Sequence, residues 1–124
     1  MPTRSPAFVH LQVHSHYSLL EGCVRIPDLV EAAIAADMSA VALTDTDGLW
    51  GAIEFYRRAE ARGIKPIIGC ELNWPMADER GGALSPAGGE DRVVLLAGTT
   101  RGYRHLMRWV TAAQGAAAGG TPRT

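Results

Sequence analysis

Segments typical of strands alternate along this chain with segments typical of helices. Short runs rich in apolar or β-branched residues predict strands at Phe8–Val13, Ala40–Leu43, Lys65–Leu72 and Val93–Ala97. Apolar residues at helical spacing predict helices at Pro27–Asp37, Gly51–Arg62 and Thr100–Gln114. Alternation of this kind favours an α/β fold, with parallel strands and helices outside them.

The end of this pattern differs from its beginning. Asn73–Asp91 contains two prolines and several glycines, which predicts a loop between the last two strands. The chain therefore ends either as strand–strand–helix or with a crossover. Four strands would make a thin open sheet, whereas a closed α/β barrel takes about 250 residues. We therefore expect residues 1–114 to be part of a larger fold, and residues 115–124, which are mostly Ala, Gly, Pro and Thr, to be a disordered tail.

The composition excludes several classes of protein. The chain has 124 residues, a net charge of -1 and 47% hydrophobic residues, as an ordinary globular domain has. A charge so near zero excludes nucleic-acid binding by bulk electrostatics. Two cysteines are too few for a disulfide scaffold and fit a reducing compartment, so we expect a cytoplasmic protein. No apolar run is long enough for a membrane span, and Met1–His10 lacks the layout of a signal peptide.

Residues that can bind metals follow three successive strand segments. In parallel α/β folds the carboxyl ends of the strands meet at one rim, where function collects. Imidazoles and carboxylates together suit zinc, manganese or iron. Taken singly, each residue has a structural alternative, such as a helix N-cap or an ion pair with a neighbouring Arg. Taken together they favour a present or ancestral metal site. They are His14, His16, Glu21, Asp45, Asp47 and Glu71.

Three motifs within these segments resemble a known family. They are YSLL-x-G at Tyr17–Gly22, LTD-x-x-x-L-x-G at Leu43–Gly51, and GIKPIIG-x-E at Gly63–Glu71. Together they resemble the start of the polymerase and histidinol phosphatase (PHP) domain of bacterial DNA polymerase III alpha subunits and error-prone C-family polymerases. The resemblance is strong from Phe8 to Trp74 and weaker over Val93–Gln114. Stand-alone PHP phosphatases share the pattern of ligands without these motifs.

The resemblance implies a fold and a chemistry. The fold would be part of a TIM-like (β/α) barrel, whose rim in active members binds up to three zinc or manganese ions. Such ions activate water and clamp a phosphate, which allows phosphoester hydrolysis or 3′–5′ exonuclease activity. Carried over by position, the family's ligands are kept at His14, Glu21 and Glu71. At three further positions the expected ligand is replaced, by Gln12, Thr46 and Arg92. The resemblance therefore implies a degraded site that binds zinc or manganese weakly or not at all.

Three functions follow from this resemblance. The leading one is the N-terminal PHP portion of a DNA polymerase III alpha-type subunit in replication or repair synthesis, with a mainly structural role. Its partners would be the remaining polymerase domains, a proofreading exonuclease subunit, and DNA through the parent enzyme. The parent that the resemblance implies would be a DNA-directed DNA polymerase, and the fragment alone is expected not to be catalytic. The alternatives are a stand-alone metal-dependent phosphoesterase or 3′–5′ exonuclease, and a truncated binding or vestigial module.

Overall fold

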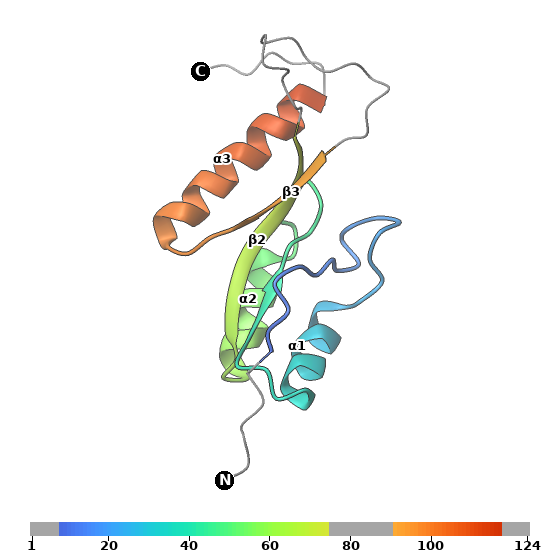
Figure 1. Cartoon of the computed structure of the whole chain (residues 1–124), viewed down its shortest axis with the longest axis vertical. Coiled ribbons are helices and arrows are strands. Elements are labelled where there is room, and N and C mark those ends of the chain that lie inside the picture. Colours follow the sequence, from blue (N-terminus) through green and yellow to red (C-terminus); the bar gives the residue numbers. More distant parts are fainter. Residues whose placement is uncertain (1–7, 75–90, 118–124) are drawn as a thin grey trace.

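The computed structural model describes residues 8–74 and 91–117, and these form a small sheet with helices packed against it (Figure 1). The elements follow in the order α1 (Ile26–Ala35), β1 (Ala40–Leu43), α2 (Ala52–Ala61), β2 (Lys65–Trp74), β3 (Asp91–Leu96) and α3 (Thr100–Ala117). The α/β class is therefore confirmed, as are the three helices and the last three strands, with small shifts at their ends. None of the helices in the described ranges has both the length and the apolar character needed to cross a membrane.

The three strands lie in the order β1-β2-β3, and the two pairings differ in direction. β1 and β2 are parallel, with Ala40 opposite Lys65, as predicted. β2 and β3 are antiparallel, with Trp74 opposite Asp91, so the prediction of parallel strands is wrong for this pair. A parallel neighbour of β2 would need a crossover connection back to the other end of the sheet. An antiparallel neighbour can start at the end where β2 finishes. The chain thus ends as strand–strand–helix.

β2 passes close to the end of β3 at Gly69, which pairs with Leu96. A Cβ atom at Gly69 would lie 2.6 Å from the carbonyl oxygen of Leu95 and 2.9 Å from Cγ2 of Thr44. Glycine therefore allows the backbones of β2 and β3 to approach at the point where their pairing begins.

The predicted first strand, Phe8–Val13, is not a strand in the structure. The segment runs beside β1, and the amides of Ala42 and Thr44 donate to the carbonyls of His10 (2.9 Å) and Val13 (2.8 Å). The spacing from His10 to Val13 is one residue longer than that from Ala42 to Thr44, so a regular ladder cannot form. The Val13 amide instead donates to the Thr44 hydroxyl at 3.0 Å.

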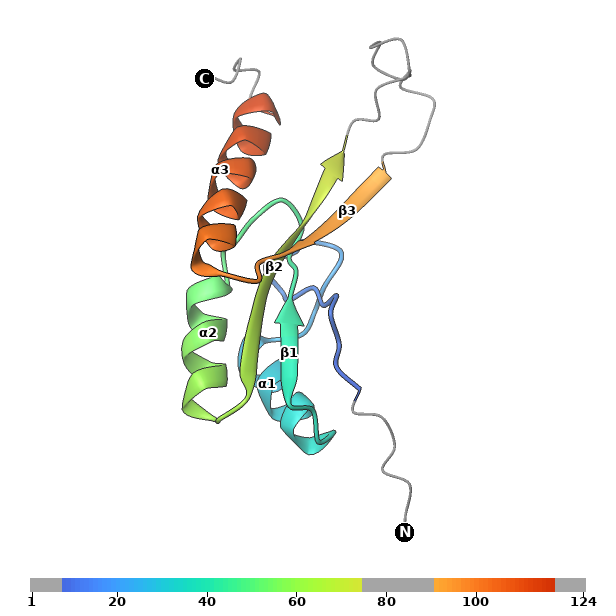
Figure 2. The ribbon, with the colours of Figure 1, turned by 60° about the vertical axis from the view of Figure 1, so that its left-hand side comes forward.

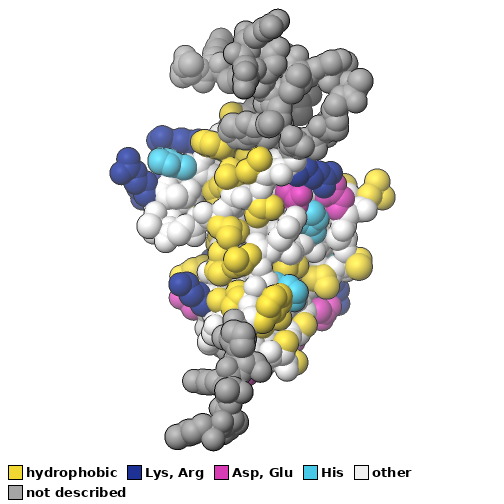
Figure 3. All heavy atoms as spheres, in the orientation of Figure 1, with side chains coloured by type: hydrophobic (Ala, Val, Ile, Leu, Met, Phe, Trp, Pro, Cys, Tyr) yellow, Lys and Arg dark blue, Asp and Glu magenta, His cyan; other side chains and the backbone are white. Residues whose placement is uncertain are grey.

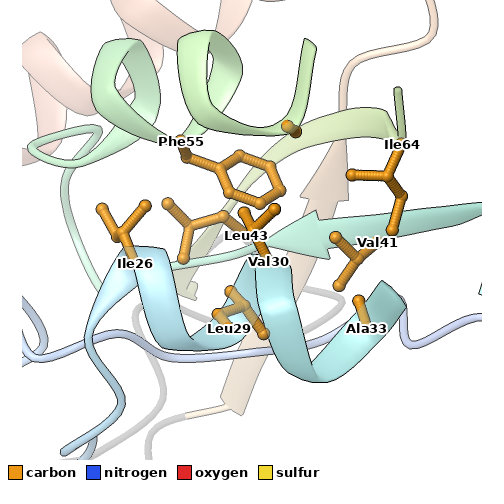
Figure 4. Packing of buried hydrophobic residues seen from close by; sticks show 9 residues of the cluster. Ile26, Leu29, Val30, Ala33, Val41, Leu43, Phe55 and Ile64 are labelled. Atoms are coloured by element: carbon orange, nitrogen blue, oxygen red, sulfur yellow. The ribbon is translucent and has the colours of Figure 1, made fainter. Parts of the chain in front are cut away.

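The hydrophobic core lies between α1, α2 and the sheet (Figure 4). α1 has a proline in its first turn, where the missing amide costs no helical hydrogen bond. Its buried face packs against Phe55 of α2, and Figure 2 shows α2 and α3 along the same side of β2. The buried cluster consists of Ile26, Leu29, Val30, Ala33, Val41, Leu43, Phe55, Ala59 and Ile64. This packing fixes the carboxyl ends of β1 and β2 relative to each other.

The predicted tail and loop fall largely outside the described residues. α3 continues to Ala117, so the prediction that disorder begins at residue 115 is wrong for residues 115–117. The reason is that alanine, abundant there, has the highest helix propensity. The rest of the tail (118–124) and most of the predicted loop (75–90) lie outside the described ranges. The predicted boundary at residue 114 falls within α3, and where the domain ends stays a prediction.

Candidate functional site

Six polar side chains from five parts of the chain converge beyond the end of β1. Two come from the segment beside β1, one from the loop before α1, one from the turn after β1, one from β2 and one from β3. Figure 3 shows acidic, basic and histidine side chains gathered at one place on the surface. The six converging side chains are the ones that the family resemblance singled out as kept or replaced ligands. They are Gln12, His14, Glu21, Thr46, Glu71 and Arg92.

Backbone pairing brings the contributing strands together. Thr46 forms a parallel bridge with Glu71, because the Glu71 amide donates to the Asp45 carbonyl (3.0 Å) and the Asp47 amide donates to the Glu71 carbonyl (2.9 Å). On the other side of β2, Arg92 pairs with Asn73. Glu71 therefore lies at the middle of the cluster.

His14 joins the two carboxylates of the cluster. Its Nε2 is hydrogen-bonded to Oε2 of Glu71, and its Nδ1 lies 3.6 Å from Oε2 of Glu21. The Gln12 amide donates to the same Oε2 of Glu71 at 3.4 Å. Glu71 is buried, with 4% of its surface exposed, so these polar contacts offset its loss of solvation.

Arg92 bridges the same two carboxylates on their other oxygens. Its Nη2 donates to Oε1 of Glu21 at 2.6 Å, and its Nη1 lies 3.9 Å from Oε1 of Glu71. The Thr46 hydroxyl donates to Oε2 of Glu21 at 2.5 Å. The hydrogen bond from Arg92, followed by that from Thr46, holds the pKa of Glu21 below its ordinary value. The same bond raises the pKa of Arg92, which stays charged.

The cluster does not fit a metal ion as it is arranged. Each ligand-type side chain is already bonded within the cluster, and the guanidinium of Arg92 contributes a positive charge beside both carboxylates. Across the described ranges, no group of three or more His, Cys, Asp or Glu residues has a geometry that could hold a metal. The guanidinium of Arg92 therefore lies beside the two carboxylates at which a cation would bind.

Asp45, which its position after β1 suggests as a metal ligand, instead holds a turn of the backbone. It is buried, and it accepts hydrogen bonds from the Ser15 amide (2.6 Å), the Ser15 hydroxyl (2.8 and 3.0 Å to its two oxygens) and the Ser18 hydroxyl (2.8 Å). It thereby holds the turn that follows His14. The alternative that Asp45 or Asp47 caps a helix is wrong, since the N-cap of α2 is Gly51, without a side-chain hydrogen bond.

Sequence reasoning missed Ser15 and Ser18 as the partners of Asp45. The only signal was a pair of serines beside the histidines, and nothing local ties them to an acidic residue 30 and 27 positions later. His16, which was grouped with the possible ligands, is exposed and lies against the ring of Tyr17, with centroids 4.3 Å apart.

Comparison with known proteins gives consistent matches. Residues 10–123 match the family model of the PHP domain. The chain is 42% identical over 106 residues to DNA polymerase III subunit alpha of Halalkalibacterium halodurans, a match that covers 86% of this chain and 9% of that protein. The corresponding protein of Bacillus subtilis is 39% identical over 114 residues, which is 92% of this chain and 10% of the relative. The error-prone DNA polymerase of Symbiobacterium thermophilum is 40% identical over 107 residues, 86% of this chain and 9% of the relative.

The chain thus spans about a tenth of the length of these curated relatives. Two solved structures share the fold. One is an amidohydrolase from Chromobacterium violaceum, with a TM-score of 0.57 and 25% identity over 92% of this chain and 40% of that one. The other is described as a putative metal-dependent phosphoesterase from Bifidobacterium adolescentis, with a TM-score of 0.52 and 24% identity over 73% of this chain and 27% of that one. These matches, together with the parallel pairing of β1 and β2, support a partial TIM-like barrel fold.

Proposed function

Since this chain belongs to the PHP domain family, we propose that it is the N-terminal PHP portion of a DNA polymerase III alpha-type subunit and supports DNA synthesis structurally. The identity of about 40% to several alpha subunits supports this origin. The chain corresponds to about a tenth of such subunits, so polymerisation would reside in the rest of the parent protein.

The ion pairs of Arg92 with Glu21 and Glu71 are the observation that most supports a structural role over a catalytic one. Phosphoester hydrolysis in this family would require metal ions, which activate water and neutralise the phosphate charge. We propose that His14, Glu21 and Glu71 are the remaining members of that ligand set. With Gln12, Thr46 and Arg92 around them, they would bind zinc or manganese weakly or not at all.

The proposed role also implies partners. The remaining domains of the polymerase polypeptide would pack against this portion, and the parent enzyme would bring it to DNA. A proofreading exonuclease subunit is a further proposed partner, and the cytoplasm is the proposed compartment. Exposed apolar side chains, including Leu19, Leu20 and Trp50, support packing against further protein surface.

Metal analysis and a phosphatase assay on the purified chain test the structural role. We expect less than stoichiometric zinc and manganese after dialysis, and no release of phosphate from a generic phosphomonoester with either metal added. The triple variant Gln12→His, Thr46→His, Arg92→His restores the imidazoles and should bind metal more tightly. Phosphate release by the wild-type chain would show a stand-alone phosphoesterase and contradict the proposal.

The gene tests the proposed origin. We expect the reading frame that contains these codons to encode further domains, including the acidic residues of a polymerase centre. A frame without polymerase domains would instead support the vestigial module.

A further inference from the structure

Arg92 contacts both carboxylates of the cluster, and we infer that its guanidinium takes the place of a bound cation. It approaches Oε1 of Glu21 at 2.6 Å and Oε1 of Glu71 at 3.9 Å. The two glutamates belong to different parts of the chain and share His14 as a neighbour. A single positive group thus lies beside two negative ones.

Every oxygen of these carboxylates has a partner inside the cluster. Both Oε1 atoms face Arg92. Oε2 of Glu21 accepts from Thr46 and lies near Nδ1 of His14, while Oε2 of Glu71 bonds to His14 and Gln12. A metal ion that entered would have to break these contacts, and in particular those of Arg92.

The positive charge of Arg92 is what allows its guanidinium to take the place of a bound cation. Without Arg92, the carboxylates of Glu21 and Glu71 would be held near one imidazole with no full positive charge from β3, and their repulsion would favour capture of a cation. A guanidinium keeps its proton at all physiological pH values and coordinates no metal. Arg92 therefore balances the charge, ties β3 to the loop before α1, and makes the cluster independent of metal.

This inference rests on the proposed loss of hydrolysis, and the substitution Arg92→Gln tests it on the 124-residue chain. The variant removes the charge and keeps a polar side chain. Zn²⁺ binding is measured by equilibrium dialysis, and the melting temperature is measured with and without Zn²⁺. We expect the variant to melt lower than wild type without metal, to bind Zn²⁺ at least about tenfold more tightly, and to recover stability when Zn²⁺ is added.

Three variants serve as controls. Arg92→Lys keeps the charge and should remain insensitive to Zn²⁺. Arg62→Gln removes a surface ion pair with Glu31, at 2.8 Å, and should not change Zn²⁺ binding. The double variant Arg92→Gln, Glu21→Gln lacks one carboxylate and should lose the gained affinity.

Equal Zn²⁺ affinity in wild type and Arg92→Gln, whether high or negligible, overturns the inference. If Arg92→Gln is unfolded without metal, circular dichroism recorded before and after addition of Zn²⁺ tests the inference. Folding on addition of Zn²⁺ supports the inference, and a chain that stays unfolded contradicts it. These results are distinct from failure of the proposed function, which would appear as phosphate release by the wild-type chain.

Discussion

Asp45 is a buried carboxylate that accepts hydrogen bonds from hydroxyl and amide donors. Ser15 contributes its amide and its hydroxyl, and Ser18 contributes its hydroxyl. The Ser18 hydroxyl also accepts a hydrogen bond from the Thr46 amide at 3.0 Å. Because these contacts join the turn after His14 to the end of β1, Asp45 positions the cluster without belonging to it.

Asp45→Ala should therefore destabilise the fold more than loss of an exposed acid. The substitution leaves several buried donors without an acceptor, which costs about 3 kcal/mol. Asp28→Ala, in the exposed first turn of α1, should cost about 1 kcal/mol or less. Urea unfolding followed by circular dichroism measures both values. Equal losses would show that the contacts of Asp45 contribute little.

Glu21 should make stability depend on pH in the acid range. Its pKa in the folded chain lies below the ordinary value of 4.5, because of the hydrogen bonds from Arg92 and Thr46. Its stabilising effect is then fully present above that ordinary value and is lost as the pH falls through the lowered folded pKa. Wild type should be more stable than Glu21→Gln at neutral pH, and the difference should shrink in acid. Thermal unfolding across this range measures it, and a difference that does not vary with pH would contradict it.

At the scale of elements, the close approach of β2 and β3 decides how Arg92 reaches the cluster. The antiparallel pairing places Arg92 opposite Asn73, two residues beyond Glu71 on β2. A parallel β3 would have run the other way and would not give this register. The direction of one strand therefore determines whether the two carboxylates meet a positive charge.

Gly69→Ala should disturb this pairing. The added methyl group would come within 2.6 Å of a backbone oxygen of β3, so the strands must separate, at a cost of about 1–3 kcal/mol. Gly98→Ala is the matched control, because a Cβ there meets no atom within 4 Å. Chemical denaturation compares the two variants. A Gly69→Ala chain as stable as the Gly98→Ala chain would show that β3 shifts without cost.

At the scale of the whole molecule, the fold leaves apolar surface uncovered. Ile53 and Tyr56 are exposed and line a cleft of about 730 Å³ between α2, the start of β2 and the start of α3, and Trp50, just before α2, is exposed as well. In the loop before α1, Leu19 and Leu20 are also exposed, and Leu20 has a positive φ of 65°. Among the described strands, β3 is also an edge of the sheet. Apolar patches and free strand edges of this kind favour association.

The isolated chain should therefore self-associate as its concentration rises. Replacing Ile53 with Lys adds a charge to the apolar patch and should weaken association, while the exposed Glu31→Lys variant should not. Sedimentation velocity over a range of concentrations gives the oligomeric state. A chain that stays monomeric throughout would contradict the prediction.

The sequence by itself determined the local elements and the identities of the cluster residues. Apolar periodicity located α1, α2 and α3, and short apolar runs located β1, β2 and β3, because these patterns depend on neighbours within a few turns of chain. The resemblance to polymerase PHP domains, carried over by position, singled out the six residues of the cluster before any geometry was known.

Only the tertiary structure decided how those positions interact. The direction of β3, the irregular path of Phe8–Val13, and the pairing of Asp45 with two serines all depend on contacts between residues far apart in the chain. So does the approach of Arg92 to Glu21, across 71 positions. The local sequence pattern does not predict such long-range contacts, because they depend on how the elements pack together.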